Sequence, residues 1–291
     1  MAERFSRDSM GLGGILTAMV TPFDSEGRLD EDATVRLIHH LLGNGSDGLV
    51  LAGSTGEGAT LTDEEKVRLW QPGVAEANGA PIIAGTGTYD TRHSVELTER
   101  AHEAGVDAML VVTPYYVKPN RRGILAHYQA VAAATDRPIV VYNIPSRTAT
   151  DMPNDLLAEL AQIDNVAAVK QARYEDMAPI EGMDLLAGND DVLAKVMDMG
   201  GTGGILVASQ LVGTEMRRVI DEPERRGEIE DGLRDLYKAL FVTTNPIPIK
   251  AALNMIGLEV GPPRLPLVEA SEEERAVIRA ALERHDLLAA V

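Results

Sequence analysis

The segment Pro138–Tyr142 (PIVVY) and the segment Val166–Lys170 (VAAVK) are short apolar runs separated by a polar stretch. Apolar runs of this length with little polar alternation are typical of strands covered on both faces, as in parallel sheets. The pattern therefore predicts one parallel sheet of eight strands. The other six runs are Gly14–Val20, Asp47–Ala52, Pro81–Gly85, Ala108–Thr113, Leu185–Gly188 and Gly204–Ala208.

The segments between these runs have the spacing of amphipathic helices. Their apolar residues recur every three or four positions, often behind an Asp or Thr that can cap a helix N-terminus. Eight strand–helix units within about 210 residues predict an α/β fold, a (β/α)8 TIM barrel. An open doubly wound sheet is the structural alternative, although it rarely has eight units so evenly spaced. The clearest helical segments are Glu31–Leu42, Asp63–Ala77, Thr91–Ala104 and Arg122–Ala134.

Strand-like runs stop after the eighth, and the remaining sequence has a helical pattern interrupted by prolines such as Pro223. Proline cannot continue a helix interior, so each of these residues marks a boundary or a connection. We therefore expect two domains: a barrel with the active site over residues 1–222 and a small C-terminal helical domain over residues 223–291. The helical stretches are Glu215–Val242, Pro248–Ile256 and Ser271–Ala290.

Composition and charge exclude several classes of protein. The 291 residues include 45 acidic and 27 basic side chains, and the net charge of −18 disfavours nucleic acid or an anionic membrane as the main partner. The chain has no cysteine, which excludes disulfides and thiol catalysis. Its six histidines lack paired ligand spacing, so no metal site is expected. The early apolar run Gly11–Val20 is about half as long as a membrane span, and no cleavage pattern follows it, so we expect a cytoplasmic protein.

Lys170 is the one lysine that ends a clean apolar run. Active sites of TIM barrels form where the strands run into the following loops, which places Lys170 at the active end. It is either a rim lysine whose head reaches water or a nucleophile. Burial would disfavour its ammonium form and lower its pKa, which increases the fraction of amine able to attack a ketone. The nearest rival, Lys250, lies outside the strand series and is interpreted as structural.

Four other polar residues lie at the end of a predicted strand or in the loop that follows one. Tyr142, on the strand before that of Lys170, is either a core tyrosine or a phenol that relays protons to and from a Schiff base. Thr55 and Tyr116 extend this relay as a chain of hydroxyls, or are ordinary loop and cap residues. Arg147 is either a surface arginine or a bidentate fork for a carboxylate. Together they fit a carbonyl compound that carries a carboxylate.

The motifs Gly53–Glu57, Thr113–Tyr116, Tyr142–Thr148 and Val169–Lys170 occur in this order along the chain. In this combination the sequence resembles the dihydrodipicolinate synthase / N-acetylneuraminate lyase family of class I aldolases, and the resemblance runs nearly end to end. Ser146-Arg147-Thr148 and the segment Asn245–Lys250 are similar to the synthase branch of the family.

The resemblance implies a pyruvate site built around Lys170, which would form a Schiff base with the keto acid. Ser54 and Thr55 would hold the pyruvate carboxylate. Gly188 and Ile205, at the ends of the last two strands, would line the same pocket. No cofactor and no metal would be needed, because the lysine imine activates the substrate covalently.

The resemblance also implies roles for the remaining residues. Thr55 would link Tyr142 to Tyr116 in the proton relay, and Tyr116 would project into the site of a neighbouring subunit of a homotetramer. Arg147 would bind the carboxylate of L-aspartate 4-semialdehyde. The reaction would be the condensation of pyruvate with this aldehyde to 4-hydroxy-tetrahydrodipicolinate, in diaminopimelate and lysine biosynthesis.

Two departures from the family pattern keep other functions open. Gln171 follows the lysine where many members have an acidic residue, and Ser54 replaces a frequent threonine. Another pyruvate-dependent aldolase or dehydratase, acting on a sugar acid or 4-hydroxy-2-oxoglutarate, is the first alternative. A non-catalytic ligand-binding barrel is the second. It would be expected to lack one of the catalytic residues.

Overall fold

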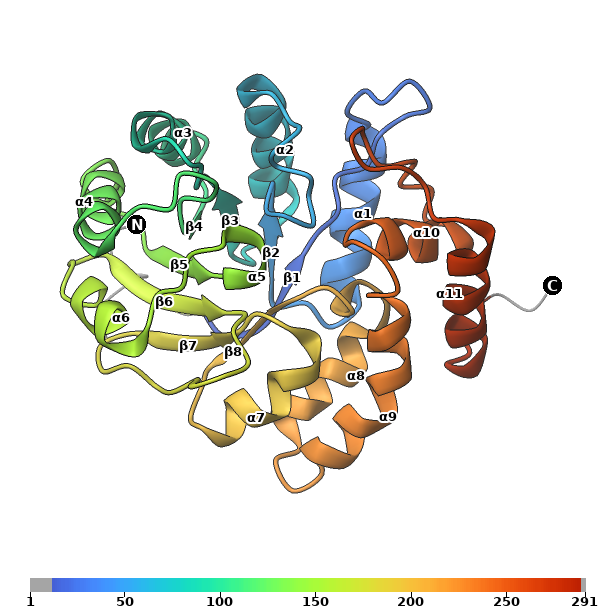
Figure 1. Cartoon of the computed structure of the whole chain (residues 1–291). Coiled ribbons are helices and arrows are strands. Elements are labelled where there is room, and N and C mark those ends of the chain that lie inside the picture. Colours follow the sequence, from blue (N-terminus) through green and yellow to red (C-terminus); the bar gives the residue numbers. More distant parts are fainter. Residues whose placement is uncertain (1–11, 289–291) are drawn as a thin grey trace.

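The computed structural model describes residues 12–288 and shows a closed barrel of eight parallel strands (Figure 1). Each strand pairs with the next along the chain, and β8 pairs with β1 to close the sheet. The predicted TIM barrel is therefore confirmed, and each strand end lies within two residues of its prediction. The strands are β1 (Gly14–Ala18), β2 (Gly48–Leu51), β3 (Ile82–Gly85), β4 (Ala108–Val112), β5 (Ile139–Asn143), β6 (Val166–Gln171), β7 (Asp184–Ala187) and β8 (Gly203–Leu206).

Side chains along each strand alternate between the inside of the barrel and the layer beneath the helices. In β1, Leu16 and Ala18 belong to the interior cluster, whereas Ile15 packs in the outer layer. Because both layers are apolar, the strands appear in the sequence as uninterrupted apolar runs. Tyr142 belongs to the interior cluster as well, so the inside of the barrel carries a polar group at its active end.

Helices cover the outside of the barrel, and four of them begin at side-chain caps. Asp30, Thr62, Asp90 and Asn120 each accept a hydrogen bond from an amide of the first turn, and Thr62 forms a capping box with Glu65. These caps put the four helix starts within one residue of the prediction. The helices are α1 (Glu31–Gly43), α2 (Asp63–Glu76), α3 (Thr91–Glu103), α4 (Arg121–Ala132), α5 (Pro145–Thr148), α6 (Asn154–Leu160), α7 (Leu193–Asp198) and α8 (Ser209–Asp221), with a 3-10 turn η1 (Asp190–Val192) before α7.

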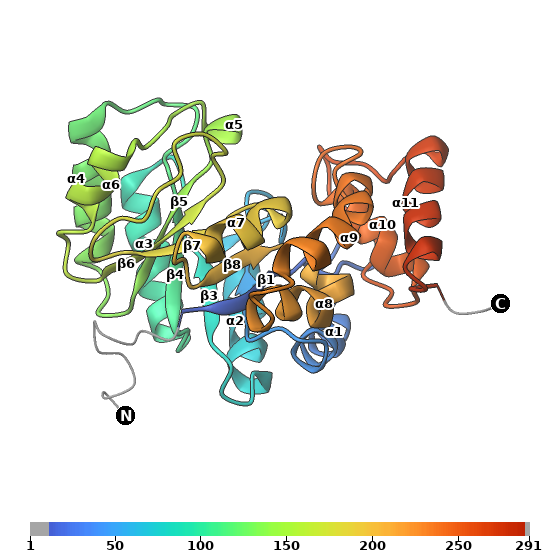
Figure 2. The same ribbon diagram turned by 90° about the horizontal axis from the view of Figure 1, so that it is seen from below.

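Three further helices, α9 (Arg226–Ala239), α10 (Ile247–Met255) and α11 (Glu272–Arg284), follow the barrel. Figure 2 shows α10 and α11 together on the side of the molecule beyond α9. The chain breaks between α8 and α9 around Pro223, as expected. No helix within residues 12–288 is long and apolar enough to cross a membrane. The division at residues 222/223 stays a prediction, because α9 packs against both the barrel helix α8 and α11.

Two helix ends differ from the sequence expectation. α8 begins at Ser209, three residues after the end of β8, rather than at Glu215. The Ser209 hydroxyl is buried and bonds to Thr17 of β1 at 2.8 Å, a contact between distant segments that local spacing does not reveal. α11 ends at Arg284 rather than at Ala290, and the last part of the expected helix lies outside the described residues.

A buried ion pair ties α10 to the barrel. Lys250 Nζ lies 2.7 Å from Oε1 of Glu57, in the loop after β2, and each side chain is only 1% exposed. Lys250 also donates to the carbonyl of Pro262 at 3.0 Å, and its Nζ lies 4.2 Å from the centre of the Phe23 ring. Each buried charge depends on the other for compensation. The geometry agrees with the structural role expected of Lys250.

Removing one partner of this pair is expected to destabilise the fold strongly. Lys250→Met leaves the Glu57 carboxylate buried without its cation, so the free energy of unfolding should fall by about 3–5 kcal/mol. The double variant Glu57→Gln/Lys250→Met should recover much of this loss. Urea denaturation followed by circular dichroism measures both effects. As a control, Arg28→Ala removes an exposed ion pair with Asp24 and should lower the free energy of unfolding by less than about 1 kcal/mol. A Lys250→Met variant as stable as wild type would contradict the prediction.

Candidate active site

Lys170 and Tyr142 lie side by side on neighbouring strands at the C-terminal end of the barrel. Tyr142 on β5 is paired in register with Lys170 on β6. Both residues are buried, at 4% and 5% exposure, and Lys170 Nζ lies 4.3 Å from the centre of the Tyr142 ring. The ring therefore covers the amine and limits its contact with water.

Burial lowers the pKa of Lys170 from its usual value of 10.5 to about 7. The carboxylate of Asp190 opposes this shift, and the guanidinium of Arg147 adds to it. A pKa near neutrality leaves a large fraction of the amine uncharged, which is the form that attacks a carbonyl carbon. Burial lowers the pKa of Lys250 as well, to about 8, but Glu57 lies against that ammonium group and favours its charged form.

Asp190, three residues after the end of β7 and the first residue of η1, contributes to the site, although no role for it was expected from the sequence. The residue is 2% exposed, and its Oδ1 accepts hydrogen bonds from Val207 N at 2.8 Å and Ala208 N at 3.2 Å. Burial raises the pKa of Asp190 to about 6, whereas these amides lower it. The carboxylate thus fixes the chain after β8 and places negative charge where it acts on Lys170. Its position after a strand end was the only signal in the sequence.

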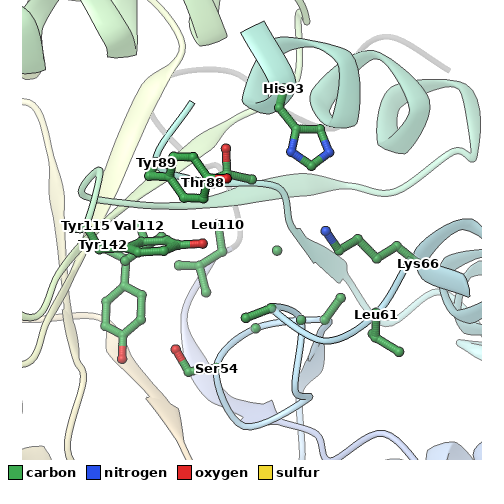
Figure 3. A pocket seen from close by; sticks show the side chains of 16 residues that line it. Ser54, Leu61, Lys66, Thr88, Tyr89, His93, Leu110, Val112, Tyr115 and Tyr142 are labelled. Carbon is green, nitrogen blue, oxygen red and sulfur yellow. The ribbon is translucent and has the colours of Figure 1, made fainter. Parts of the chain in front are cut away.

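Burial raises the pKa of the Tyr142 phenol to about 12, so the phenol is protonated at neutral pH and can donate a proton. Arg147 and a hydrogen bond with Ser54 lower this pKa. Figure 3 shows the Tyr142 hydroxyl beside Ser54. Ser54 therefore contacts Tyr142 directly, whereas the resemblance implied Thr55 as the link.

Thr55 and Arg147 both form hydrogen bonds with Asn245, which was noted in the sequence only as part of the segment Asn245–Lys250. Asn245 Nδ2 donates to Thr55 Oγ1 at 3.0 Å, and Arg147 Nη2 donates to the main-chain carbonyl of Asn245 at 3.1 Å. Arg147 is exposed on α5, the single helical turn after β5, where its guanidinium is accessible to a carboxylate. The structure therefore brings together residues from the loops after β2 and β5 and from the segment before α10.

Tyr116 lies apart from this cluster. It is 89% exposed and has a φ of 69°, a backbone conformation that residues other than glycine adopt only occasionally. Its neighbour Tyr115 instead turns toward the pocket and packs edge-on against Tyr89, with ring centres 5.6 Å apart. Within one chain, the Tyr116 side chain is thus exposed rather than buried, and its place in the relay stays a prediction.

Gly188 and Ile205 lie at the active end, as their positions in the sequence predict. Gly188 N, directly after β7, donates to Gln171 O at 2.8 Å. A Cβ at Gly188 would lie 2.8 Å from the backbone of Gln171, so only glycine fits there. Ile205, on β8, is fully buried in the interior cluster that contains Tyr142. Their contact with a substrate is still a prediction.

A cavity of about 270 Å³ opens beside Tyr142 (Figure 3). Ser54 and Tyr142 lie on one side of it, and Lys66 and His93 lie on the other. Burial lowers the pKa of Lys66, and His93 Nε2 lies 3.0 Å from both carboxylate oxygens of Asp63. Tyr142 therefore lines the cavity and also covers the amine of Lys170. Among residues 12–288, no cluster of three or more His, Cys, Asp or Glu side chains is placed to hold a metal ion.

Comparison with known proteins places this geometry in a family. The model of the dihydrodipicolinate synthetase family matches residues 11–285. The 4-hydroxy-tetrahydrodipicolinate synthase of Moorella thermoacetica is 44% identical over 294 residues, covering 96% of this chain and 100% of the relative. The enzyme of the same name from Bacillus subtilis is 41% identical over 287 residues, covering 94% and 99% of the two chains.

Solved structures agree with the sequence comparison. Dihydrodipicolinate synthase from Cyanidioschyzon merolae, solved with lysine bound, has a TM-score of 0.91 at 37% identity and covers 95% of this chain and 99% of its own. The enzyme from Acinetobacter baumannii, solved with pyruvate, also has a TM-score of 0.91, at 33% identity, with 95% and 100% of the two chains covered. This chain belongs to the dihydrodipicolinate synthetase family.

Proposed function

We propose that the protein is a 4-hydroxy-tetrahydrodipicolinate synthase, a lyase that condenses pyruvate with L-aspartate 4-semialdehyde in diaminopimelate and lysine biosynthesis. The observation that carries the proposal is the buried amine of Lys170, with a pKa of about 7, against the ring of Tyr142 at the active end of the barrel. The relatives that bear this name over their full length support the choice of reaction.

The first half of the reaction forms an imine. Lys170 Nζ attacks the carbonyl carbon of pyruvate, the carbonyl oxygen takes up protons, and water leaves. Tyr142 is protonated at neutral pH and lies against Lys170, so it can donate and recover these protons. Ser54 and Thr55 offer hydroxyl groups to the pyruvate carboxylate. Loss of a proton from the methyl group then gives an enamine.

The second half forms the new carbon–carbon bond. The enamine carbon attacks the aldehyde carbon of the semialdehyde, and the aldehyde oxygen takes a proton to become the hydroxyl of the product. The amino group of the same substrate then displaces Lys170 from the imine, which closes the ring and frees the lysine. One water leaves overall and no electrons are exchanged, so the cycle runs through the lysine imine without a further cofactor. Arg147 binds the carboxylate of the semialdehyde.

Oligomerisation completes the proposed site. Tyr116, its neighbour Val117 and Tyr89, which lines the cavity, are all exposed. A second copy of the chain would cover these apolar side chains. In a homotetramer, Tyr116 would enter the neighbouring subunit's relay. We expect this assembly in the cytoplasm.

A second candidate, another pyruvate-dependent aldolase or dehydratase, would use the same imine with a different acceptor. The exposed guanidinium of Arg147 favours the synthase over the sugar-acid enzymes of the family, which often lack an arginine at this position. A non-catalytic ligand-binding barrel is disfavoured, since it would be expected to lack one of the catalytic residues, whereas Lys170, Tyr142, Thr55 and Tyr116 are all present.

Borohydride trapping tests the nucleophile. Reduction in the presence of pyruvate should convert the imine to a stable secondary amine, and peptide mass mapping should locate the adduct on Lys170. Lys170→Ala should not be trapped. Lys195→Ala, which removes an exposed lysine of α7, is the matched control and should be trapped as wild type is. An adduct on a different lysine would refute the assignment.

Arg147→Ala tests the second substrate. Loss of a charged hydrogen bond of about 1.5–3 kcal/mol should raise the KM for L-aspartate 4-semialdehyde roughly 10- to 100-fold, with pyruvate trapping intact. Steady-state assays with the semialdehyde and with sugar acids measure this difference, and Arg225→Ala on the surface is the control. If wild type turns over a sugar acid better than the semialdehyde, the second candidate function is favoured.

The pH profile tests the amine. Because only neutral Lys170 attacks, kcat/KM for pyruvate should rise tenfold per pH unit at acid pH and level off above a midpoint near 7. Asp190→Asn keeps an oxygen that can accept from the amides of Val207 and Ala208 but removes the charge that raises the pKa of Lys170, so the midpoint should move to lower pH. Asp198→Asn, at an exposed position, should leave the midpoint unchanged. A midpoint above 9 in wild type would show that Lys170 is hydrated.

A further inference from the structure

The helical turn that carries Arg147 depends on the rest of the chain for its position. α5 has four residues, and within residues 12–288 no side chain caps its N-terminus. Isolated helices of this length are not stable in water, so tertiary contacts must fix the turn. Arg147 is close enough to Lys170 and Tyr142 for its charge to lower the pKa of both. A displaced turn would therefore move this charge relative to the proposed reaction site.

Arg173, two residues after the end of β6, contacts the segment that follows α5. Its Nη1 donates to Asp151 Oδ2 at 2.7 Å, and its Nη2 donates to Asn154 Oδ1 at 3.1 Å and to the carbonyl of Asp176 at 3.0 Å. The Arg173 side chain is 13% exposed, so water screens its ion pair with Asp151 less than it screens a surface pair. Arg173 thus joins the chain after β6 to the connection between α5 and α6.

Asn143, the last residue of β5, holds the same connection through its side chain. Asn143 is fully buried, and its Nδ2 donates to Asp151 Oδ1 at 2.9 Å. Its Oδ1 accepts from the amide of Met152 at 3.2 Å. Asp151 therefore accepts one hydrogen bond on each carboxylate oxygen, from Asn143 on one and from Arg173 on the other. This carboxylate is the point at which the ends of β5 and β6 hold the segment after α5.

The segment between Arg147 and Asp151 is short and has little freedom. Four positions separate the two residues, and residues 148–152 contain no glycine. Thr148, next to Arg147, is 1% exposed, and its hydroxyl donates to the carbonyl of Thr150 at 2.8 Å. A constraint on Asp151 is therefore transmitted to the turn that carries Arg147.

We propose that Arg173 is a positioning residue that acts through Asp151 and holds the turn bearing Arg147 where the guanidinium can bind the carboxylate of the second substrate. The inference rests on the proposed function, which assigns the carboxylate of the semialdehyde to Arg147. The bond from Arg147 Nη2 to the carbonyl of Asn245 orients the guanidinium itself, whereas the contacts of Asp151 fix the backbone behind it.

Steady-state kinetics with Arg173→Gln test this proposal. Glutamine keeps a polar side chain but loses the charge and the reach to Asp151. The KM for the semialdehyde should rise about 5- to 30-fold, because a small misplacement of a binding group weakens its contact with the substrate. This rise should be smaller than the one caused by Arg147→Ala, which removes the guanidinium altogether.

Exchange of the pyruvate methyl hydrogens with deuterated water separates positioning from general damage to the site. This exchange needs the imine and the enamine but no second substrate, so in Arg173→Gln its rate should stay within about twofold of wild type. Proton NMR measures it, at a pH about two units above the Lys170 midpoint, where the amine is uncharged. A general structural defect would slow the exchange and raise the KM together.

A double-mutant cycle shows whether Arg173 acts through Arg147. Adding Arg173→Gln to Arg147→Ala should raise the KM by less than about a further twofold, since the residue that is positioned is already gone. Asp151→Asn has nearly the same shape as wild type, but its single oxygen cannot accept from both Asn143 and Arg173. It should therefore raise the KM about as much as Arg173→Gln.

Arg121→Gln is the matched control. Arg121, the first residue of α4, pairs with Asp155 of α6 at 2.6 Å and also with Glu159 of the same helix. Its loss removes two ion pairs to α6 but none to the segment after α5, so the KM for the semialdehyde should stay within about twofold of wild type.

Three results would overturn the inference: a wild-type KM in folded Arg173→Gln, a loss of exchange equal to the change in KM, or fully multiplicative effects in the double variant. If Arg173→Gln does not fold, Asp151→Asn decides by the same criteria. Failure of wild type to be trapped at Lys170, or to turn over the semialdehyde, would instead overturn the proposed function, and this inference with it.

Discussion

The loss of hydration at one amine is the constraint on which the proposed chemistry depends. Water stabilises an ammonium ion, and enclosure at the end of β6 removes that stabilisation, which lowers the pKa of Lys170 to about 7. The closed barrel provides the enclosure, because Lys170 has a neighbouring strand on each side, with Tyr142 and Leu186 in register. An open sheet edge at this position would admit water. Barrel closure and nucleophile activation are therefore one structural requirement.

Lys170 and Lys250, two buried lysines, show that burial alone does not decide whether a lysine is reactive. Lys250 is paired with Glu57 and donates to a backbone carbonyl, so its ammonium form is compensated and it serves as a structural link. Lys170 has no hydrogen-bond acceptor within residues 12–288, and the opposed charges of Asp190 and Arg147 act on it. Similar burial thus gives a fixed cation in one case and a reactive amine in the other. The difference between the two lysines comes from the carboxylate that pairs with Lys250, and not from how deeply each side chain is buried.

Local sequence pattern was sufficient to predict the barrel and the position of the proposed nucleophile at a strand end. Strands covered on both faces are uninterrupted apolar runs, and a lysine at the end of such a run, as at Lys170, is visible without any structure. The role of Asp190 was missed because its partners, Val207 and Ala208, follow a different strand. The contact between Thr55 and Asn245 joins residues 190 positions apart, and the spacing of apolar residues along the sequence cannot predict such a contact. The start of α8 at Ser209 was missed for the same reason.

The active site does not belong to the barrel alone. Asn245 and Lys250, from the chain after α9, touch the loop after β2, and Arg147 on α5 is tethered to the same segment. If the C-terminal helices detached, Lys170 and Tyr142 would keep their strand register, because that register is set by the sheet. Thr55 and Arg147 would lose the contacts that orient them. In the proposed reaction the barrel thus supplies the amine, and the segment before α10 holds Thr55 and Arg147, the residues proposed to bind the two substrates.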